Sequence, residues 1–340
     1  MSGPTVAVVG ATGAVGREML ATLERREFPV GALRLMASER SAGSTVPTPW
    51  GEVTVETLSV ADPTGIDIAL FSVGGARSLE HAGRFAEAGA VVVDNSSAWR
   101  MEPTVPLVVV GVNDAAAARH SGIIANPNCT TMVMLMALAP LHRAFGLKDL
   151  VASSYQAVSG SGHKGVATLV DEVTHFARDV DALRTGEWQE PAPGFYVRPI
   201  GWNVIPFAGG PADGGYTDEE LKLVYETRKI LGAPDVRVEA TCVRVPVVAG
   251  HGVAVTAWFE REAPIAEAAD LIAAGPGVEV WTDKVPTPLD AAGRDEALVG
   301  RIRPTLGRPG GVSLWVVGDN LRKGAALNAV QIAEIIASSK

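Results

Sequence analysis

Apolar residues recur with two alternating periods in the first part of the chain. Short apolar runs predict buried strands, and amphipathic stretches between them predict helices. The predicted strands cover residues 5–9, 33–37, 66–73, 90–94, 107–112 and 123–125, and the predicted helices cover 15–25 and 76–88. Strands and helices that alternate through short connections indicate a doubly wound parallel sheet.

The pattern changes after about residue 146. A strand at 150–158 and a helix at 164–183 precede a Pro/Gly/aromatic-rich segment, 186–215, which has no periodicity. Long loops of this kind are often functional. The remaining predicted elements are helices at 218–231 and 323–336, antiparallel-type strands at 236–248 and 252–259, and shorter strands at 278–280 and 313–317.

Composition limits the class of protein. The chain has 340 residues, 47% of them hydrophobic and 20% charged, which is ordinary for a globular enzyme with room for two domains. A net charge of -9 argues against a nucleic-acid or anionic-membrane partner. The apolar run 132–141 is too short to span a bilayer, and the N-terminal run is expected to be a first strand, not a signal peptide.

Two cysteines, Cys129 and Cys242, provide neither a disulfide scaffold nor a closed zinc site, so we expect a cytoplasmic protein. Cys129 lies in Asn126-Pro127-Asn128-Cys129-Thr130-Thr131, between a predicted strand and a predicted helix. The N–H groups and positive dipole end of that helix favour a thiolate over a thiol, whose pKa is normally about 8.5. Cys129 is therefore a candidate nucleophile, although simple burial is the alternative.

A glycine-rich turn follows the first predicted strand. Gly10, Gly13 and Gly16 have the spacing that lets a backbone turn tightly and approach a pyrophosphate at a helix N-terminus. The turn therefore predicts a dinucleotide-binding site.

The end of the second predicted strand bears on which dinucleotide binds. Ser38, Arg40 and Ser41 suit a ribose 2′-phosphate, and so favour NADP. Glu39 suits the 2′-hydroxyl of NAD if it points inward, and a solvated charge pair is a further alternative.

Other chemically active residues are scattered along the chain. His251 is a candidate acid/base group, and Arg100, Lys222 and Arg244 are candidates for an anion pocket, if the fold brings them to Cys129. His163 and the other histidines lack metal-ligand spacing, so no metal site is predicted.

Eight motifs in one order resemble the aspartate-β-semialdehyde dehydrogenase family over essentially the whole chain. They are GATGAVG (10–16), DNSSAWR (94–100), NPNCTT (126–131), YQAVSGSG (155–162), YTDEELK (216–222), CVRVPVVAGH (242–251), AAGRDEALVGRIR (291–303) and WVVGDNLRKGAA (315–326). The resemblance implies NADPH-dependent reductive dephosphorylation of L-aspartyl-4-phosphate to L-aspartate 4-semialdehyde, in the biosynthesis of lysine (through diaminopimelate), threonine, methionine and isoleucine.

The same resemblance implies roles for individual residues. Cys129 would form the thioester, Gln156 would orient the acyl group, and His251 would be the acid/base residue. Arg244 and Glu219 would hold the amino-acid part of the substrate, and Arg100, Asn128 and Lys222 the phosphate. The residues expected at the NADP cofactor are Gly10, Thr12, Gly13, Ala14, Val15, Ser38, Arg40, Ser41, Ser159, Gly160 and Asn320.

The implied fold is α/β, with an N-terminal Rossmann-type parallel sheet and an inserted α+β catalytic and dimerisation domain like that of glyceraldehyde-3-phosphate dehydrogenase. Residues 1–129 plus 320–340 would bind NADP, and 130–319 would form the catalytic domain of a homodimer. The alternatives are N-acetyl-γ-glutamyl-phosphate reductase, which has no use for Glu219, a catalytically inactive nucleotide-binding homologue, and a cysteine hydrolase, which has no use for the glycine turn.

Overall fold

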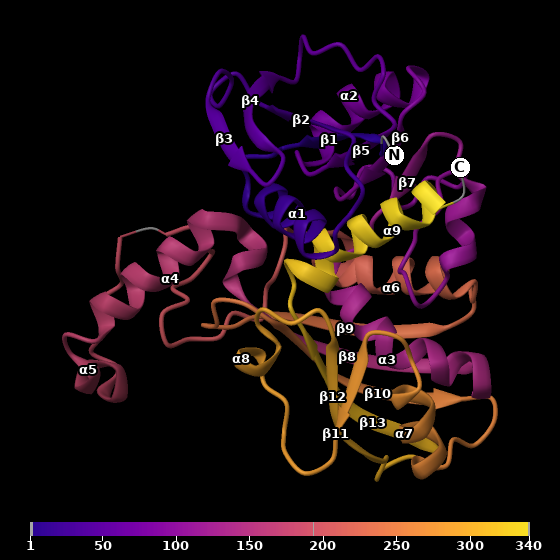
Figure 1. Ribbon diagram of the computed structural model, residues 1–340. Coiled ribbons are helices and arrows are strands. Elements are labelled where there is room, and N and C mark those ends of the chain that lie inside the picture. The colour runs from indigo at the N-terminus through magenta and orange to yellow at the C-terminus, as the bar shows by residue number, and fades with distance from the viewer. Residues whose placement is uncertain (1–2, 193, 339–340) are drawn as a thin grey trace. The chain divides into compact units, whose positions relative to one another are not determined.

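The computed structural model describes residues 3–192 and 194–338, and the chain divides into two compact units, each built on a β-sheet (Figure 1). The first unit contains residues up to 135 together with 225–234 and the C-terminal segment from 321. The second contains 136–224 and 235–320. Within the described residues, no helix is both long and apolar enough to cross a lipid bilayer.

The sheet of the first unit is largely parallel, as predicted. Its order is β3 (Thr45–Thr48), β4 (Gly51–Thr57), β2 (Ala32–Ala37), β1 (Thr5–Val9), β5 (Ile68–Phe71), β6 (Val91–Asp94) and β7 (Ile123–Ala125). β3 pairs antiparallel with β4, and the other pairs are parallel. The hairpin β3–β4 was not predicted, because almost all of its side chains are exposed or half-buried and show no apolar run. The strand order reverses at β1, where ligands of open α/β sheets bind.

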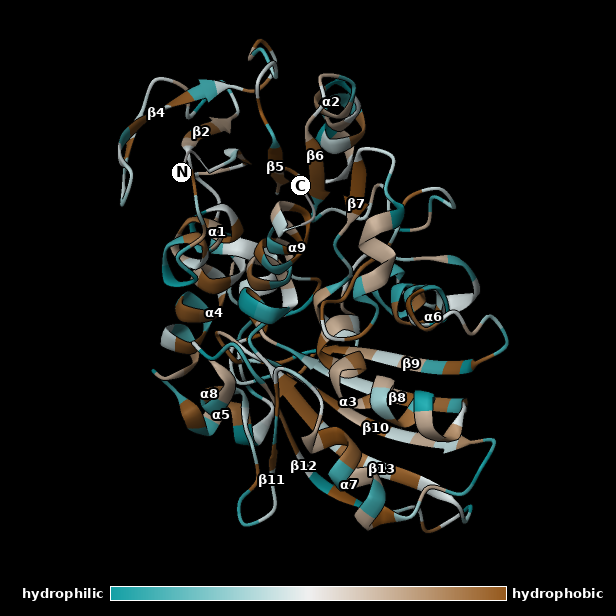
Figure 2. Ribbon diagram, turned by 45° about the vertical axis from the view of Figure 1, so that its right-hand side comes forward, coloured by the Kyte–Doolittle hydropathy of each residue, from teal (hydrophilic) through white to brown (hydrophobic). Residues whose placement is uncertain are grey.

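Helices cover both faces of this sheet. α1 (Ala14–Arg25) and α9 (Leu327–Ser338), together with the 3₁₀-helix Asp114–Arg119, share a core with one face, to which Val6 and Val8 contribute. On the other face, Phe71 contacts Phe85 of α2 (Gly75–Glu87) edge-on, with 5.0 Å between ring centroids. Strands β5, β6 and β7 are accordingly hydrophobic, except for Asp94 at the end of β6 (Figure 2).

The predicted strand at 107–112 is wrong. Only Leu107 pairs with the sheet, through a bridge to Ala125. Beyond it, the backbone N–H of Val109 donates to the side chain of Asn113, and that of Val110 donates to the side chain of Asn328. Side-chain amides therefore satisfy backbone groups that a strand would have paired.

The second unit has a mixed sheet. Its order is β11 (Val278–Trp281), β12 (Ala297–Pro304), β13 (Gly311–Gly318), β10 (His251–Phe259), β8 (Leu147–Gln156) and β9 (Arg237–Arg244). β10 is antiparallel to β8 and β13, as predicted for it. The antiparallel prediction for β9 is wrong, because β9 pairs with β8 in parallel.

The helices of this unit are α4 (Gly162–Phe176), α5 (Val180–Thr185), α7 (Ile265–Ala273) and α8 (Pro288–Ala291), with 3₁₀-helices at Val158–Ser161 and Asp213–Gly215. The prediction of a single helix at 164–183 is wrong, because the segment forms two helices, α4 and α5. The side chain of Asp179 accepts the backbone N–H of Ala182 and so caps the start of α5. The long loop packs Ile200 and Ile205 beside Leu169 of α4, so part of it is a small core of its own. α3 (Cys129–Phe145) and α6 (Asp218–Leu231) each contribute residues to both units.

Candidate active site

Cys129 is the first residue of α3, at the strand-to-helix turn where the sequence placed it. β7 ends at Ala125, and Asn128 caps the helix that follows. The Asn128 Oδ1 atom accepts the backbone N–H of Thr130 at 2.9 Å and that of Thr131 at 3.1 Å. This cap fixes the start of α3, and so the direction in which the thiol of Cys129 leaves the backbone.

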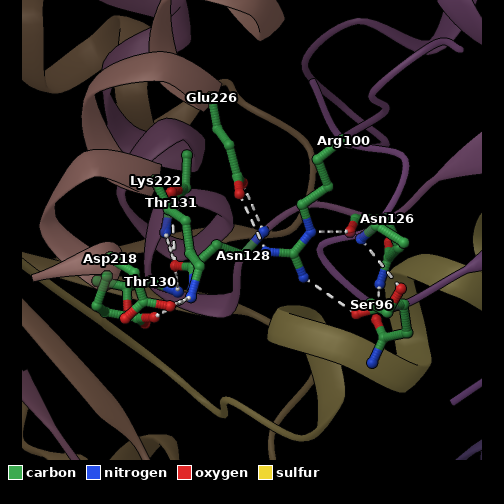
Figure 3. Close-up of polar contacts among 12 residues, drawn as sticks. Ser96, Arg100, Asn126, Asn128, Thr130, Thr131, Asp218, Lys222 and Glu226 are labelled. Carbon is green, nitrogen blue, oxygen red and sulfur yellow. Dashed lines mark hydrogen bonds and ion pairs between the residues drawn. The ribbon is translucent and has the colours of Figure 1, made fainter. Parts of the chain in front are cut away.

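Arg100 lies beside this turn in the first unit. Its Nε donates to the carbonyl oxygen of Asn126 at 3.0 Å, and its Nη1 donates to a Glu226 carboxylate oxygen at 3.0 Å (Figure 3). Its Nη2 donates to the carbonyl oxygen of Asn95, also at 3.0 Å. The first unit therefore brings together three of the predicted residues: Arg100, Asn128 and Cys129.

The second unit collects another predicted group at one edge of its sheet. β8 ends at Gln156 and β9 ends at Arg244, and these two residues are direct partners in the parallel register. β10 runs the other way and begins at His251, one residue before the partner of Tyr155. Residues almost 100 positions apart therefore meet because one strand of the three is antiparallel to the other two.

His251 is buried and neutral at physiological pH. Burial, and secondarily the charge of Arg244, lower its pKa to about 3. The backbone N–H of Ala157 donates to its Nδ1 at 3.0 Å. Because Nδ1 accepts, the proton of the neutral ring is on Nε2, which makes this atom the donor.

Arg244 is anchored through the same residue. Its Nη1 donates to the carbonyl oxygen of Ala157 at 2.7 Å, and its guanidinium carbon lies 5.8 Å from the ring centroid of Tyr196. Its Nε is buried and has no hydrogen-bond partner among the described residues. A buried orphan donor next to His251 is suited to an anionic ligand.

Glu219 connects the strand end to α6. One carboxylate oxygen accepts from the side-chain amide of Gln156 at 3.1 Å, and the other accepts from Lys222 at 3.1 Å. Lys222 also donates to Asp218 at 2.7 Å. Burial lowers the pKa of Lys222, but the carboxylates of Glu219 and Asp218 raise that pKa by more. The net pKa is raised, so the ammonium stays charged.

Ser159, Gly160 and Asn320 belong to the same group. The hydroxyl of Ser159 lies 2.9 Å from Nδ2 of Asn320, whose Oδ1 accepts the N–H of Gly250. A Cβ at Gly160 would lie 3.3 Å from Nε2 of His251 and 3.6 Å from Nη1 of Arg244. A side chain at this position would therefore press against the imidazole of His251 and the guanidinium of Arg244.

The glycine turn of the first unit suits a dinucleotide. Gly10 has a φ of +91°, and a Cβ at Gly16 would lie 2.2 Å from the carbonyl oxygen of Gly10. α1 begins at Ala14 without a side-chain cap at Gly13 and without an acidic residue in its first turn, so an anion can meet its N–H groups. Thr12 lies in this turn and Val15 in the first turn of α1, and a pocket lined by Ala11, Thr12, Arg17 and residues 44–49 opens beside them.

The candidate 2′-phosphate residues adjoin the same turn. The hydroxyl of Thr12 donates to that of Ser41 at 3.2 Å, and Ser38 and Arg40 lie in the turn that follows β2. The carboxylate of Glu39 accepts from Ser59 at 2.8 Å. Glu39 therefore has a partner within the protein.

The structure also adds a residue that sequence analysis missed, Glu226. It is buried in the first unit and contacts both Arg100 and the backbone of Asn128. A glutamate in an amphipathic helix is normally solvated, so nothing in the local pattern distinguished it. The second cysteine is inert, because burial raises the pKa of Cys242 to about 12.

Two family models match the chain. Residues 5–120 match the semialdehyde dehydrogenase NAD-binding domain, and residues 138–323 match the semialdehyde dehydrogenase dimerisation domain. Together they cover most of the sequence.

Individual relatives match over nearly full length. The chain is 52% identical over 338 residues to the aspartate-semialdehyde dehydrogenase of Streptomyces akiyoshiensis, with 98% of each chain covered. Aspartate semialdehyde dehydrogenase II from Vibrio cholerae, solved in complex with ASA, has a TM-score of 0.93, 42% identity and 99% coverage of each chain. The Candida albicans enzyme solved with NADP has a TM-score of 0.75, 25% identity and 98% coverage of each chain. The chain therefore belongs to the aspartate-semialdehyde dehydrogenase family.

Proposed function

We propose that this protein reduces L-aspartyl-4-phosphate to L-aspartate 4-semialdehyde and inorganic phosphate, through a thioester on Cys129. The observation that supports this most directly is the position of Cys129 at the capped start of α3, with Arg100 held beside the same turn. The family relationship favours this reaction over reduction of N-acetyl-γ-glutamyl phosphate and over an inactive homologue.

In the first step the thiolate of Cys129 attacks the acyl carbon, and the carbon–oxygen bond to phosphate breaks with its electron pair leaving on phosphate. Arg100, Asn128 and Lys222 are proposed to stabilise that leaving group, and the charged state of Lys222 suits this role. Arg244 and Glu219 are proposed to hold the α-carboxylate and α-amino group. Gln156, fixed by Glu219, is proposed to orient the acyl oxygen.

In the second step the thioester is reduced, and NADPH supplies the hydride. His251 holds a proton on Nε2, from which it is proposed to donate a hydrogen bond to the acyl oxygen as negative charge develops there. When that oxyanion re-forms the carbonyl, the carbon–sulfur bond breaks with its electron pair on sulfur, which leaves the aldehyde and the thiolate of Cys129.

The cofactor is proposed to be NADP. Gly10, Thr12, Gly13, Ala14 and Val15 would follow the pyrophosphate, and Ser38, Arg40 and Ser41 would hold the 2′-phosphate. Ser159, Gly160 and Asn320 would lie on the nicotinamide side. The hydrogen bond from Ser59 to Glu39 supports NADP, because it competes with a ribose hydroxyl for that carboxylate.

The test is the phosphate-dependent oxidation of aspartate semialdehyde, run with NADP and NAD side by side. We expect turnover to require phosphate and to be faster with NADP. Arg40→Ala is expected to weaken NADPH binding more than NADH binding, and equal effects on both would overturn the 2′-phosphate assignment. Turnover that does not depend on phosphate would overturn the proposed reaction.

A further inference from the structure

Glu226 is a buried carboxylate that accepts hydrogen bonds from Arg100 and Asn128, which lie far from it in the sequence. Its side chain is 2% exposed, and it lies in the segment of α6 that belongs to the first unit. One oxygen accepts from Nη1 of Arg100 at 3.0 Å, and the other accepts the backbone N–H of Asn128 at 2.6 Å (Figure 3). A single side chain therefore joins Arg100 to the residue that precedes Cys129.

The contact to Asn128 completes the cap of α3. In a capping box, the cap side chain accepts an N–H of the first turn while an acidic side chain accepts the N–H of the cap residue itself. Asn128 performs the first task for Thr130 and Thr131. Glu226 performs the second from another part of the chain, so the start of α3 depends on α6.

The contact to Arg100 sets the direction of its guanidinium. Glu226, Asn126 and Asn95 receive one N–H each from Nη1, Nε and Nη2. A guanidinium has five N–H groups, so these contacts leave one on each terminal nitrogen. Two such donors match the bidentate grip of a phosphate.

We infer that Glu226 is a positioning residue for the reaction, whose carboxylate fixes the phosphate-binding Arg100 relative to the turn that presents Cys129. The inference rests on the proposed function. One helical turn further along α6, Lys229 donates to the carbonyl oxygens of Arg100 and Glu102 at 2.7 Å and of Val105 at 2.9 Å. This part of α6 thus holds the Arg100 segment at two levels.

Glu226→Gln tests the inference because it keeps the size of the side chain but replaces one of its two acceptor oxygens with an NH₂ group. The amide has one acceptor oxygen, whereas both partners are donors, so either Arg100 or Asn128 faces an N–H group and must move. A misplacement of about 1 Å can lower a rate by about 10²-fold. We expect kcat/KM for phosphate, in semialdehyde oxidation, to fall by at least about tenfold.

Glu220→Gln is the matched control. Glu220 is buried in the same helix and also accepts two backbone N–H groups, from Thr217 at 2.8 Å and Cys242 at 2.9 Å. Neither partner belongs to the proposed site. We expect this variant to lower the melting temperature and to keep kcat/KM for phosphate within about threefold of the parent.

A double-mutant cycle with Arg100→Lys separates positioning from a general structural role. If Glu226 acts partly through Arg100, adding Glu226→Gln to Arg100→Lys lowers kcat/KM for phosphate by clearly less than it does in the parent protein. The inference would be overturned if the losses in kcat/KM of the two single variants multiply in full in the double variant. It would also be overturned if kcat/KM of Glu226→Gln stays within about threefold of the parent.

A second measurement does not depend on turnover. Inorganic phosphate should protect Cys129 from alkylation by iodoacetamide, and Glu226→Gln should raise the half-protecting concentration by about tenfold. If Glu226→Gln does not fold, Glu226→Asp takes its place, because it keeps the charge and is shorter by one methylene. It is also expected to raise the half-protecting phosphate concentration. A parent protein that phosphate protects but that shows no phosphate-dependent turnover overturns the proposed function alone. Equal protection of parent and variant overturns the role of Glu226 alone.

Discussion

His251 and Cys129 illustrate how local surroundings assign chemistry to single residues. The imidazole is buried, accepts the N–H of Ala157 and is therefore a neutral donor at Nε2. The thiol lies at a capped helix start. In each case the expected chemistry depends on these surroundings and not on the residue type alone.

The two cysteines differ in what their loss should change. Cys129→Ala is expected to abolish turnover while NADPH binding persists, because the nucleotide turn is separate in sequence from the thiol. Cys242→Ala, in the interior of β9, is expected to lower the melting temperature and keep most activity. Steady-state rates and thermal unfolding of both variants check this. Substantial turnover by Cys129→Ala would show that the nucleophile is another group.

The lowered pKa of His251 predicts how stability depends on pH. Between its folded value of about 3 and the ordinary value of 6.5, the unfolded chain binds the proton and the folded chain does not. This histidine therefore makes the free energy of unfolding fall as the pH falls through that window, by up to about 1.4 kcal/mol per pH unit. In urea unfolding between pH 4 and 6, His251→Gln should show a shallower pH slope than the parent. An identical slope would contradict the assignment.

At the scale of elements, strand ends and helix starts bring the candidate residues together. Gln156 and Arg244 end parallel neighbours, and His251 begins the antiparallel strand beside them. α6 then adds Glu219 and Lys222 in its first turns. The elements themselves need only ordinary apolar residues to form, and their ends are available for chemistry.

The cap of α3 predicts a separable effect at this scale. Asn128→Ala removes the acceptor for Thr130 and Thr131 and should cost about 0.5–2 kcal/mol of stability. Asn128→Ser keeps a capping oxygen but not the amide, so it should recover most of the stability. If Asn128 also contacts phosphate, the KM of the serine variant for phosphate should stay above that of the parent protein. Full recovery of both quantities would limit Asn128 to capping.

At the scale of the whole molecule, the chain is an oxidoreductase with an NAD-binding domain and a dimerisation domain. We expect a homodimer, so sedimentation equilibrium should give about twice the mass of one chain at micromolar concentration. A monomer mass with full activity would contradict this expectation.

The sequence by itself determined the elements whose periodicity is local and strong: β1, its glycine turn and α1, the helix at 218–231, and the turn that places Cys129 at a helix start. It also determined the family, through many motifs in one order. Only the tertiary structure decided that β9 is parallel to β8, that residues beyond Leu107 leave the sheet, and that Glu226 is buried between Arg100 and Asn128. These features depend on hydrogen bonds between residues about 20 to 220 positions apart, which leave no trace in local patterns of hydrophobic and polar residues.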